Sequence, residues 1–242
     1  MTVQISRKDI TSEELLDLQS ETRFLKLPVV PYLDLLGITP LSSQIAIINA
    51  INNPKYRFIC AALSRRQGKT YIANIIGQLV SLVPNSNILI ISPNYALIKH
   101  FDLEIKRDNA KDKIIELSNG STVRMGSINQ VDSTVGRSYD LIIFDEAALS
   151  ADGRDAFNVA LRPTLDKVNS KAIFVSTPRG KNNWFAEFYD RGYNDDYPEW
   201  ASIKATYRDN PRMSQTDINE AKSTMSEAEF RQEYEADFNT YE

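Results

Sequence analysis

Segment 64–70, which reads Ser-Arg-Arg-Gln-Gly-Lys-Thr, constrains the fold of this 242-residue chain more than any other feature. An apolar run at 57–63 precedes it, and a helical pattern at 71–80 follows it. A strand, a tight loop and a helix that begins at Gly-Lys-Thr suit phosphate binding, because the N–H groups and the dipole of the helix favour an anion there. The pattern predicts that Lys69 reaches the β- and γ-phosphates of a nucleotide and that the Thr70 hydroxyl ligates Mg²⁺.

This loop departs from the usual pattern in two ways. Leu63 stands where the first glycine is normally found, and Arg65 and Arg66 lie inside the loop. Arginine stabilises the charge that develops on a transferred γ-phosphoryl group, so Arg65 is the first candidate for a catalytic arginine supplied in cis. The alternative is an ordinary solvated helix cap. The loop residues expected to bind the nucleotide are Ser64, Arg65, Arg66, Gln67, Gly68, Lys69 and Thr70.

The composition is that of a globular domain. Its 42% hydrophobic and 25% charged residues suit one large α/β domain, alone or with a small lid. No apolar run approaches the ~20 residues that span a bilayer, and no secretory signal is visible at the N-terminus. Cys60 is the only cysteine and His100 the only histidine, which excludes an internal disulfide and a Cys/His zinc site. We therefore expect an intracellular location.

The net charge of −4 lacks the basic excess of a stand-alone nucleic-acid binder. A local basic face is still compatible with this charge, although for most of the clustered basic residues a solvated helix face and hairpin are favoured. The cluster comprises Lys99, Lys106, Arg107, Lys111, Lys113 and Arg124.

Apolar runs alternate with helical patterns along most of the chain. Continuous apolar runs suit strands buried on both faces, and their alternation with helices implies right-handed crossovers. The sequence therefore predicts an α/β fold with a mainly parallel central sheet flanked by helices. We expect strands at 57–63, 87–92, 140–144 and 171–176, helices at 42–52, 71–80 and 95–107, and a hairpin at 114–125 with its turn at Asn119-Gly120.

Changes of composition divide the chain into three regions. Residues 1–40 are expected to form an N-terminal appendage that packs on the lid, and residues 41–182 a P-loop ATPase core. Aromatic and acidic residues dominate from 183 to 242, which predicts a small helical lid or linker subdomain. Capping boxes are expected at 11–14 in the appendage and at 226–229 in the lid.

Two carboxylates, Asp145 and Glu146, end the apolar strand at 140–144. Parallel strands deliver such residues to the carboxyl edge of a sheet, where ligands bind. Asp145 is predicted to hold Mg²⁺ together with Thr70, and Glu146 to orient and activate the attacking water. The alternative is that Asp145 merely caps a following helix.

Four segments resemble the ATPase domain of the terminase large subunit, the DNA-packaging motor of tailed bacteriophages. They are a deviant phosphate loop with an arginine after the serine, a hairpin, the Asp-Glu strand and a Ser-Thr-Pro turn. Their order along the chain is also that of the family. The segments are 60–70, 115–121, 135–147 and 175–180.

The resemblance implies a RecA/ASCE-like P-loop NTPase fold and further site residues. Gln44 matches the glutamine that reads adenine, and Ser176 and Thr177 match coupling residues that sense the γ-phosphate. Val135 stands where many terminases have the arginine of an Arg-Gly pair, so Arg137 is only a substitute candidate for a finger acting in trans. Arg179 is a further candidate arginine.

The same resemblance implies ATP and Mg²⁺ as cofactors and double-stranded DNA, the portal protein and the small terminase subunit as partners. It also implies a homo-oligomeric ring on the procapsid, although the domain alone is compatible with a monomer. The host cell cytoplasm is the expected location. The family continues into a nuclease domain, which we expect to be absent here, so no nuclease activity is expected.

Two other functions suit parts of this pattern. A superfamily 2 helicase shares both phosphate-site motifs and a Ser-Thr turn, but it needs a second RecA-like domain. A nucleotide-binding switch needs no water-activating carboxylate, so Glu146 argues against it.

Overall fold

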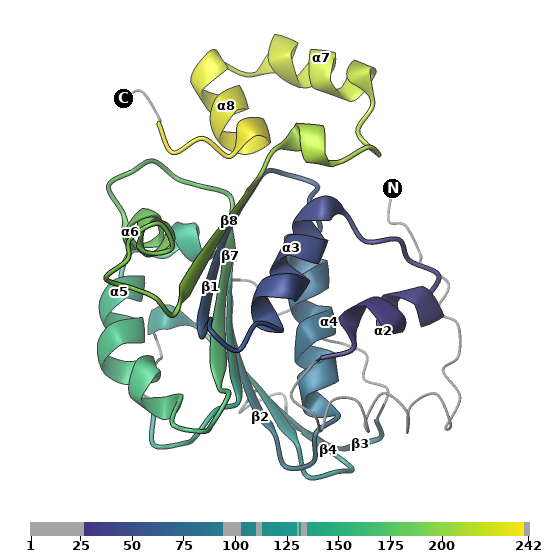
Figure 1. Ribbon diagram of the computed structural model, residues 1–242, viewed down its shortest axis with the longest axis vertical. Helices are drawn as coiled ribbons and strands as arrows, with labels where there is room; N and C mark the ends of the chain where they lie inside the picture. The colour runs from purple at the N-terminus through teal and green to yellow at the C-terminus, as the bar shows by residue number, and fades with distance from the viewer. Residues whose placement is uncertain (1–26, 94–102, 110–112, 130, 132–134, 240–242) are drawn as a thin grey trace.

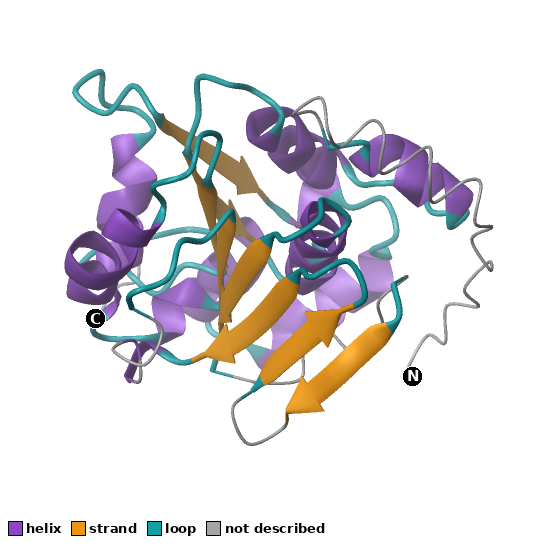
Figure 2. Cartoon of the chain, turned by 90° about the horizontal axis from the view of Figure 1, so that it is seen from below, coloured by secondary structure: helices purple, strands orange, loops and turns teal. Residues whose placement is uncertain are grey.

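The computed structural model describes residues 27–93, 103–109, 113–129, 131 and 135–239. Within this part the chain forms an eight-stranded sheet with the order β3-β4-β5-β2-β6-β7-β1-β8 (Figures 1 and 2). The strands from β5 to β8 along this order are mutually parallel, whereas β4 runs antiparallel to both of its neighbours. The strands are β1 (Phe58–Leu63), β2 (Asn87–Ile91), β3 (Ile105–Asn109), β4 (Ile114–Leu117), β5 (Thr122–Gly126), β6 (Leu141–Asp145), β7 (Lys171–Ser176) and β8 (Trp200–Ala205).

Helices cover both faces of the sheet, as Figure 1 shows. One face carries α2 (Val29–Leu35), α3 (Ser42–Ile51) and α4 (Lys69–Ser81). The other carries α5 (Gly153–Asp155), the π-helical η3 (Ala156–Leu161), η4 (Arg162–Thr164) and α6 (Trp184–Arg191). The short η2 (Ala147–Leu149) follows β6, and a C-terminal unit of η5 (Tyr207–Asp209), α7 (Gln215–Thr224) and α8 (Glu227–Glu235) lies above the carboxyl edge of the sheet.

Strand β1 shows why the central strands are continuous apolar runs. Successive side chains of a strand point to opposite faces of the sheet. Ile59 and Leu63 accordingly belong to the aliphatic core under α3 and α4, whereas Phe58 and Cys60 belong to an aromatic core under α6. Both faces are buried, so every residue of β1 is apolar. The predicted α/β fold with a mainly parallel sheet is confirmed.

Most predicted elements of the core are present, but the helix expected at 95–107 is wrong in its described part. Residues 94–102 lie outside the described residues, and Ile105–Asn109 form β3. This strand pairs antiparallel with β4, with Arg107 opposite Glu116. Charged, exposed residues are typical of an edge strand, where they discourage pairing with another chain.

The lid boundary expected at 183 also differs from the structure. Helix α6 buries Trp184, Phe185 and Phe188 in the aromatic core, and β8 extends the sheet beside β1, with Ala61 opposite Ile203. The aromatic residues that suggested a lid thus complete the second face of the sheet.

The helical C-terminal unit begins only after β8. Its last helix begins as predicted, because Ser226 accepts a hydrogen bond from the Glu229 amide and Glu229 caps in return.

The described part of the N-terminal region packs on the core. Tyr32 of α2 donates a hydrogen bond to Gln78 of α4 (3.1 Å), and Leu27 and Asn52 exchange two hydrogen bonds. One contact reaches the C-terminal unit, where Arg212 donates to the Thr39 carbonyl (2.8 Å). The capping box expected at 11–14 lies outside the described residues. The position of the whole appendage therefore stays a prediction.

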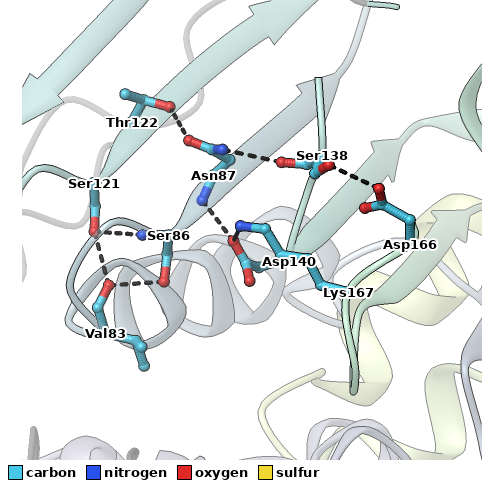
Figure 3. Close-up of polar contacts among 9 residues, drawn as sticks. All are labelled: Val83, Ser86, Asn87, Ser121, Thr122, Ser138, Asp140, Asp166 and Lys167. Carbon is cyan, nitrogen blue, oxygen red and sulfur yellow. Dashed lines mark hydrogen bonds and ion pairs between the residues drawn. The ribbon is translucent and has the colours of Figure 1, made fainter. Parts of the chain in front are cut away.

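A polar network connects β2, β5 and β6 at their amino ends, which lie opposite the carboxyl edge that carries the phosphate loop (Figure 3). The Asn87 amide and Lys167 both donate to one carboxylate oxygen of Asp140, at 2.7 and 2.6 Å. The Asn87 side chain accepts from Thr122 and donates to the Ser138 carbonyl.

No described helix is long and apolar enough to cross a membrane.

Lys171 begins β7 with its ammonium group held by backbone. Its Nζ donates to the carbonyl oxygens of Asn53 (2.8 Å) and Tyr56 (2.7 Å), beyond the end of α3. Burial lowers the pKa of Lys171 to about 8. Above that pH the folded chain loses this proton while the unfolded chain still holds it, so the titration of Lys171 favours folding as the pH rises towards the ordinary lysine value.

We therefore expect the stability difference between the native protein and Lys171→Met to grow in favour of the native protein between pH 8 and about 10. Urea midpoints of both proteins at several pH values measure this difference. Lys204→Met, which removes an exposed lysine from β8, is the matched control and is expected to show no such trend. A difference that shrank with rising pH would contradict the assigned direction.

Candidate nucleotide site

The phosphate loop connects β1 to α4 at the carboxyl edge of the sheet. Two of its residues have left-handed backbone, Arg66 at φ +60° and Gly68 at φ +66°. The left-handed backbone favours glycine at position 68, and a Cβ there would lie 2.6 Å from Nε2 of Gln44, so the Gln44 side chain would have to shift. The loop is thus wound tightly beneath Gln44, the residue matched to adenine recognition.

Lys69 points inward from the start of α4. It is 9% exposed, and its Nζ donates to Oγ1 of Thr177 (3.0 Å) and to the Ser64 carbonyl (3.4 Å). Desolvation lowers the pKa of Lys69, and the charges of Glu146 and Asp145 oppose that shift. The solvated helix cap considered above does not describe this lysine, because its ammonium group lies within the site.

Asp145, at the end of β6, lies beside the first turn of α4. Thr70 Oγ1 donates to one of its carboxylate oxygens at 2.8 Å, while the other oxygen is buried and has no hydrogen-bond partner. Desolvation raises the pKa of Asp145, and the Thr70 hydrogen bond opposes the rise. A hydroxyl and a carboxylate with one unused buried oxygen suit Mg²⁺, which takes few protein ligands and completes its shell with water and phosphate.

Glu146 follows in a left-handed conformation, φ +51°, which is uncommon outside glycine. Its carbonyl accepts the Leu149 amide (3.0 Å), which closes η2. Asp145 does not cap this turn with its side chain, so the helix-cap alternative is not what the structure shows. The described residues contain no cluster of three or more histidine, cysteine or acidic groups able to hold a metal by themselves.

The two coupling candidates at the end of β7 have different partners. Thr177 accepts the hydrogen bond from Lys69, whereas Ser176 accepts one from the Ala148 amide (3.1 Å) and donates to the Thr177 carbonyl. One residue therefore faces the phosphate loop and the other faces the turn after Glu146.

Glu233 of α8 holds two of the arginines that were considered for the nucleotide site, Arg65 and Arg179. Arg65 donates to it through Nε (2.7 Å) and through its backbone amide, and Arg179 lies 3.3 Å from its other carboxylate oxygen. The Glu233 side chain is 9% exposed, and its hydrogen bond raises the pKa of Arg65. Sequence patterns predicted no individual role for this carboxylate, which joins the C-terminal unit to the phosphate loop.

Further contacts hold the loop between α3 and the C-terminal unit. Gln67 accepts from Ser43 (2.8 Å) and donates to the Thr206 carbonyl (2.7 Å). Arg66 lies 3.7 Å from Asp217 of α7, and Gln44 accepts the Leu41 amide with its side-chain oxygen. Side chains of the loop thus contact α3 on one side and the C-terminal unit on the other.

Arg137 lies away from the phosphate loop. It precedes the amino end of β6, whereas Asp145 is the last residue of that strand, so the two lie at opposite edges of the sheet. Its charge acts on Tyr139, whose pKa is raised by burial and lowered in part by Arg124 and Arg137. A role for Arg137 at the nucleotide of a neighbouring subunit stays a prediction.

A family model described as the N-terminal part of the terminase large subunit, T4likevirus type, matches residues 49–240. The large terminase subunit of Escherichia phage T5 is 52% identical over 99% of this chain, and that of Thermus phage G20c is 26% identical over 87%. The chain spans 57% and 51% of the lengths of these two relatives.

Solved structures show the same fold. The large terminase ATPase domain of Thermus phage P74-26 matches 86% of this chain and 97% of that one, with a TM-score of 0.70 and 23% identity. The large terminase of a thermophilic bacteriophage, solved in complex with ADP, matches 83% of this chain and 54% of that one, with a TM-score of 0.65 and 16% identity.

Proposed function

We propose that this chain, which belongs to the T4-like terminase large-subunit family, hydrolyses ATP to drive the packaging of double-stranded DNA into a viral procapsid. One observation carries the proposal. Lys69 and Thr70 at the start of α4 come together with Asp145 and Glu146 at the end of β6, at the carboxyl edge of the sheet. Each of these side chains has a role in phosphoryl transfer to water.

Binding would use the loop and the start of α4. Backbone N–H groups of the loop and the Lys69 ammonium would hold the β- and γ-phosphates, and Gln44 would contact adenine. Thr70 and Asp145 would hold Mg²⁺, which neutralises phosphate charge when bound. Lys69 already lies desolvated in this position, so its charge would act on the phosphates in a medium of low polarity.

Glu146 would orient the attacking water and accept its proton. Positioning and charge neutralisation supply most of the rate enhancement in phosphoryl transfer, so a single carboxylate beside the water suffices. Arg65 and Arg179 are two of the arginines considered for contact with the γ-phosphate, and both are held by Glu233 of α8. Contact of either arginine with a γ-phosphate would then couple the nucleotide, through Glu233, to the C-terminal unit.

The motor itself requires partners. DNA contacts through phosphates would be independent of sequence and would weaken steeply with salt. Assembly as a ring on the portal protein, with the small terminase subunit, would bring Arg137 of one subunit towards the nucleotide of the next. The family match argues against the helicase alternative, since it accounts for the whole segment 49–240.

Phosphate release and thermal unfolding of the purified 242-residue protein test the enzymatic part of the proposal. We expect ATP turnover that EDTA abolishes, and an unfolding temperature that rises with ATP and Mg²⁺, because a ligand that binds only the folded state stabilises it. CTP at the same concentration is the control for base recognition by Gln44. The absence of both ATP turnover and stabilisation by ATP would contradict the proposal.

A further inference from the structure

Ser176 is the last residue of β7, and Glu146 directly follows the last residue of β6. The two strands are paired in parallel, and their last paired residues are Asp145 and Val175, so the chain continues from this pair to Glu146 on one side and to Ser176 on the other. Ser176 is fully buried at 0% exposed. A hydroxyl in that position faces the protein interior and not the open side of the site.

The hydroxyl of Ser176 is used within the protein. Its Oγ accepts the Ala148 amide at 3.1 Å and donates to the Thr177 carbonyl at 2.9 Å. Ala148 lies in η2, the turn that begins at the left-handed Glu146. Ser176 therefore ties the turn after Glu146 to the neighbouring strand.

The left-handed backbone of Glu146 is unfavourable for a residue with a side chain, and the surrounding structure has to maintain it. The Leu149 amide bonds the Glu146 carbonyl, and the Trp184 indole donates to the Ser150 carbonyl at the end of the turn. The Ser176 hydroxyl holds the middle of the turn. Without it the Ala148 amide would lose its partner and the turn could relax, which would move the Glu146 carboxylate.

We propose that Ser176 is a positioning residue for Glu146, and that Thr177 alone of this pair communicates with the phosphates, through Lys69. This inference rests on the proposed ATP hydrolysis and names a different role for each of two adjacent residues that were expected to act together. Ser176 would set the rate of hydrolysis without contacting the nucleotide.

Steady-state kinetics of Ser176→Ala test this role. We expect kcat to fall about 10-fold or more, because a small misplacement of a catalytic group is costly, while KM and ATP affinity stay unchanged. Ser170→Ala is the matched control, since Ser170 is 1% exposed next to the other end of β7 and accepts from Arg57. That control is expected to keep the native kcat.

A double-mutant cycle separates positioning from general destabilisation. If Ser176 acts through Glu146, adding Ser176→Ala to Glu146→Gln lowers the residual rate no further, because the carboxylate is already gone. The same further loss in both backgrounds, or a raised KM with native kcat, would overturn the inference.

Amide hydrogen exchange gives a readout that needs no turnover. The Ala148 amide should exchange faster in Ser176→Ala than in the native protein without nucleotide, and unchanged exchange would overturn the inference. Failure of the native protein to hydrolyse ATP would instead contradict the proposed function.

Discussion

Replacing Glu146 by glutamine is expected to lower ATP turnover by at least about 10²-fold, the usual contribution of a positioned general base. Glutamine has nearly the same size, so the turn at η2 should persist, but an amide cannot accept a proton from the attacking water. The binding groups Lys69, Thr70 and Asp145 are unchanged by this substitution. ATP affinity should therefore stay close to that of the native protein.

Phosphate release under multiple- and single-turnover conditions, together with binding of a fluorescent ATP analogue, measures both expectations. Glu116→Gln is the matched control because it makes the same chemical change in β4, far from the phosphate loop, where Glu116 lies 3.7 Å from Arg107. Its turnover should equal that of the native protein. Native turnover in Glu146→Gln would remove Glu146 from the site.

Local patterns predict the centre of this fold because the pattern and the structure arise from the same residues. The run 58–63 is apolar because both faces of β1 are buried, and the phosphate loop is a continuous segment whose chemistry is visible in the sequence. The sheet topology then brings Lys69, Asp145 and Thr177 together, because the segments that follow the carboxyl ends of parallel strands meet at one edge of the sheet.

Residues that depend on distant partners were not predictable in this way. Strand β8 has only Trp200 and Ala205 buried, and its pairing with β1 joins segments about 140 residues apart, so its own pattern is weak. Glu233 resembles the other acidic residues of α8, and its importance comes from Arg65, which lies 168 residues away in the sequence. Edge strand β3 was missed for the same reason, because β4 provides its pairing.

Replacing Lys69 by methionine is expected to weaken ATP binding by about 10²-fold, since hydrogen bonds from a charged donor to phosphate contribute roughly 1.5–3 kcal/mol and the charge itself is lost. Methionine keeps much of the length of lysine and leaves the loop glycine, Gly68, in place. The loss should appear in the affinity for ATP and for ADP, because Lys69 is expected to reach the β-phosphate as well as the γ-phosphate.

The same substitution is not expected to destabilise the protein without nucleotide. Desolvation lowers the pKa of Lys69, so its protonated form favours the unfolded chain at neutral pH, and an apolar side chain removes that cost. Calorimetric titration with ATP and urea unfolding without ligand measure the two effects in one preparation. The pair of results is diagnostic, because a misfolded variant would lose both affinity and stability. A folded Lys69→Met protein that still bound ATP tightly would instead place the phosphates outside this loop.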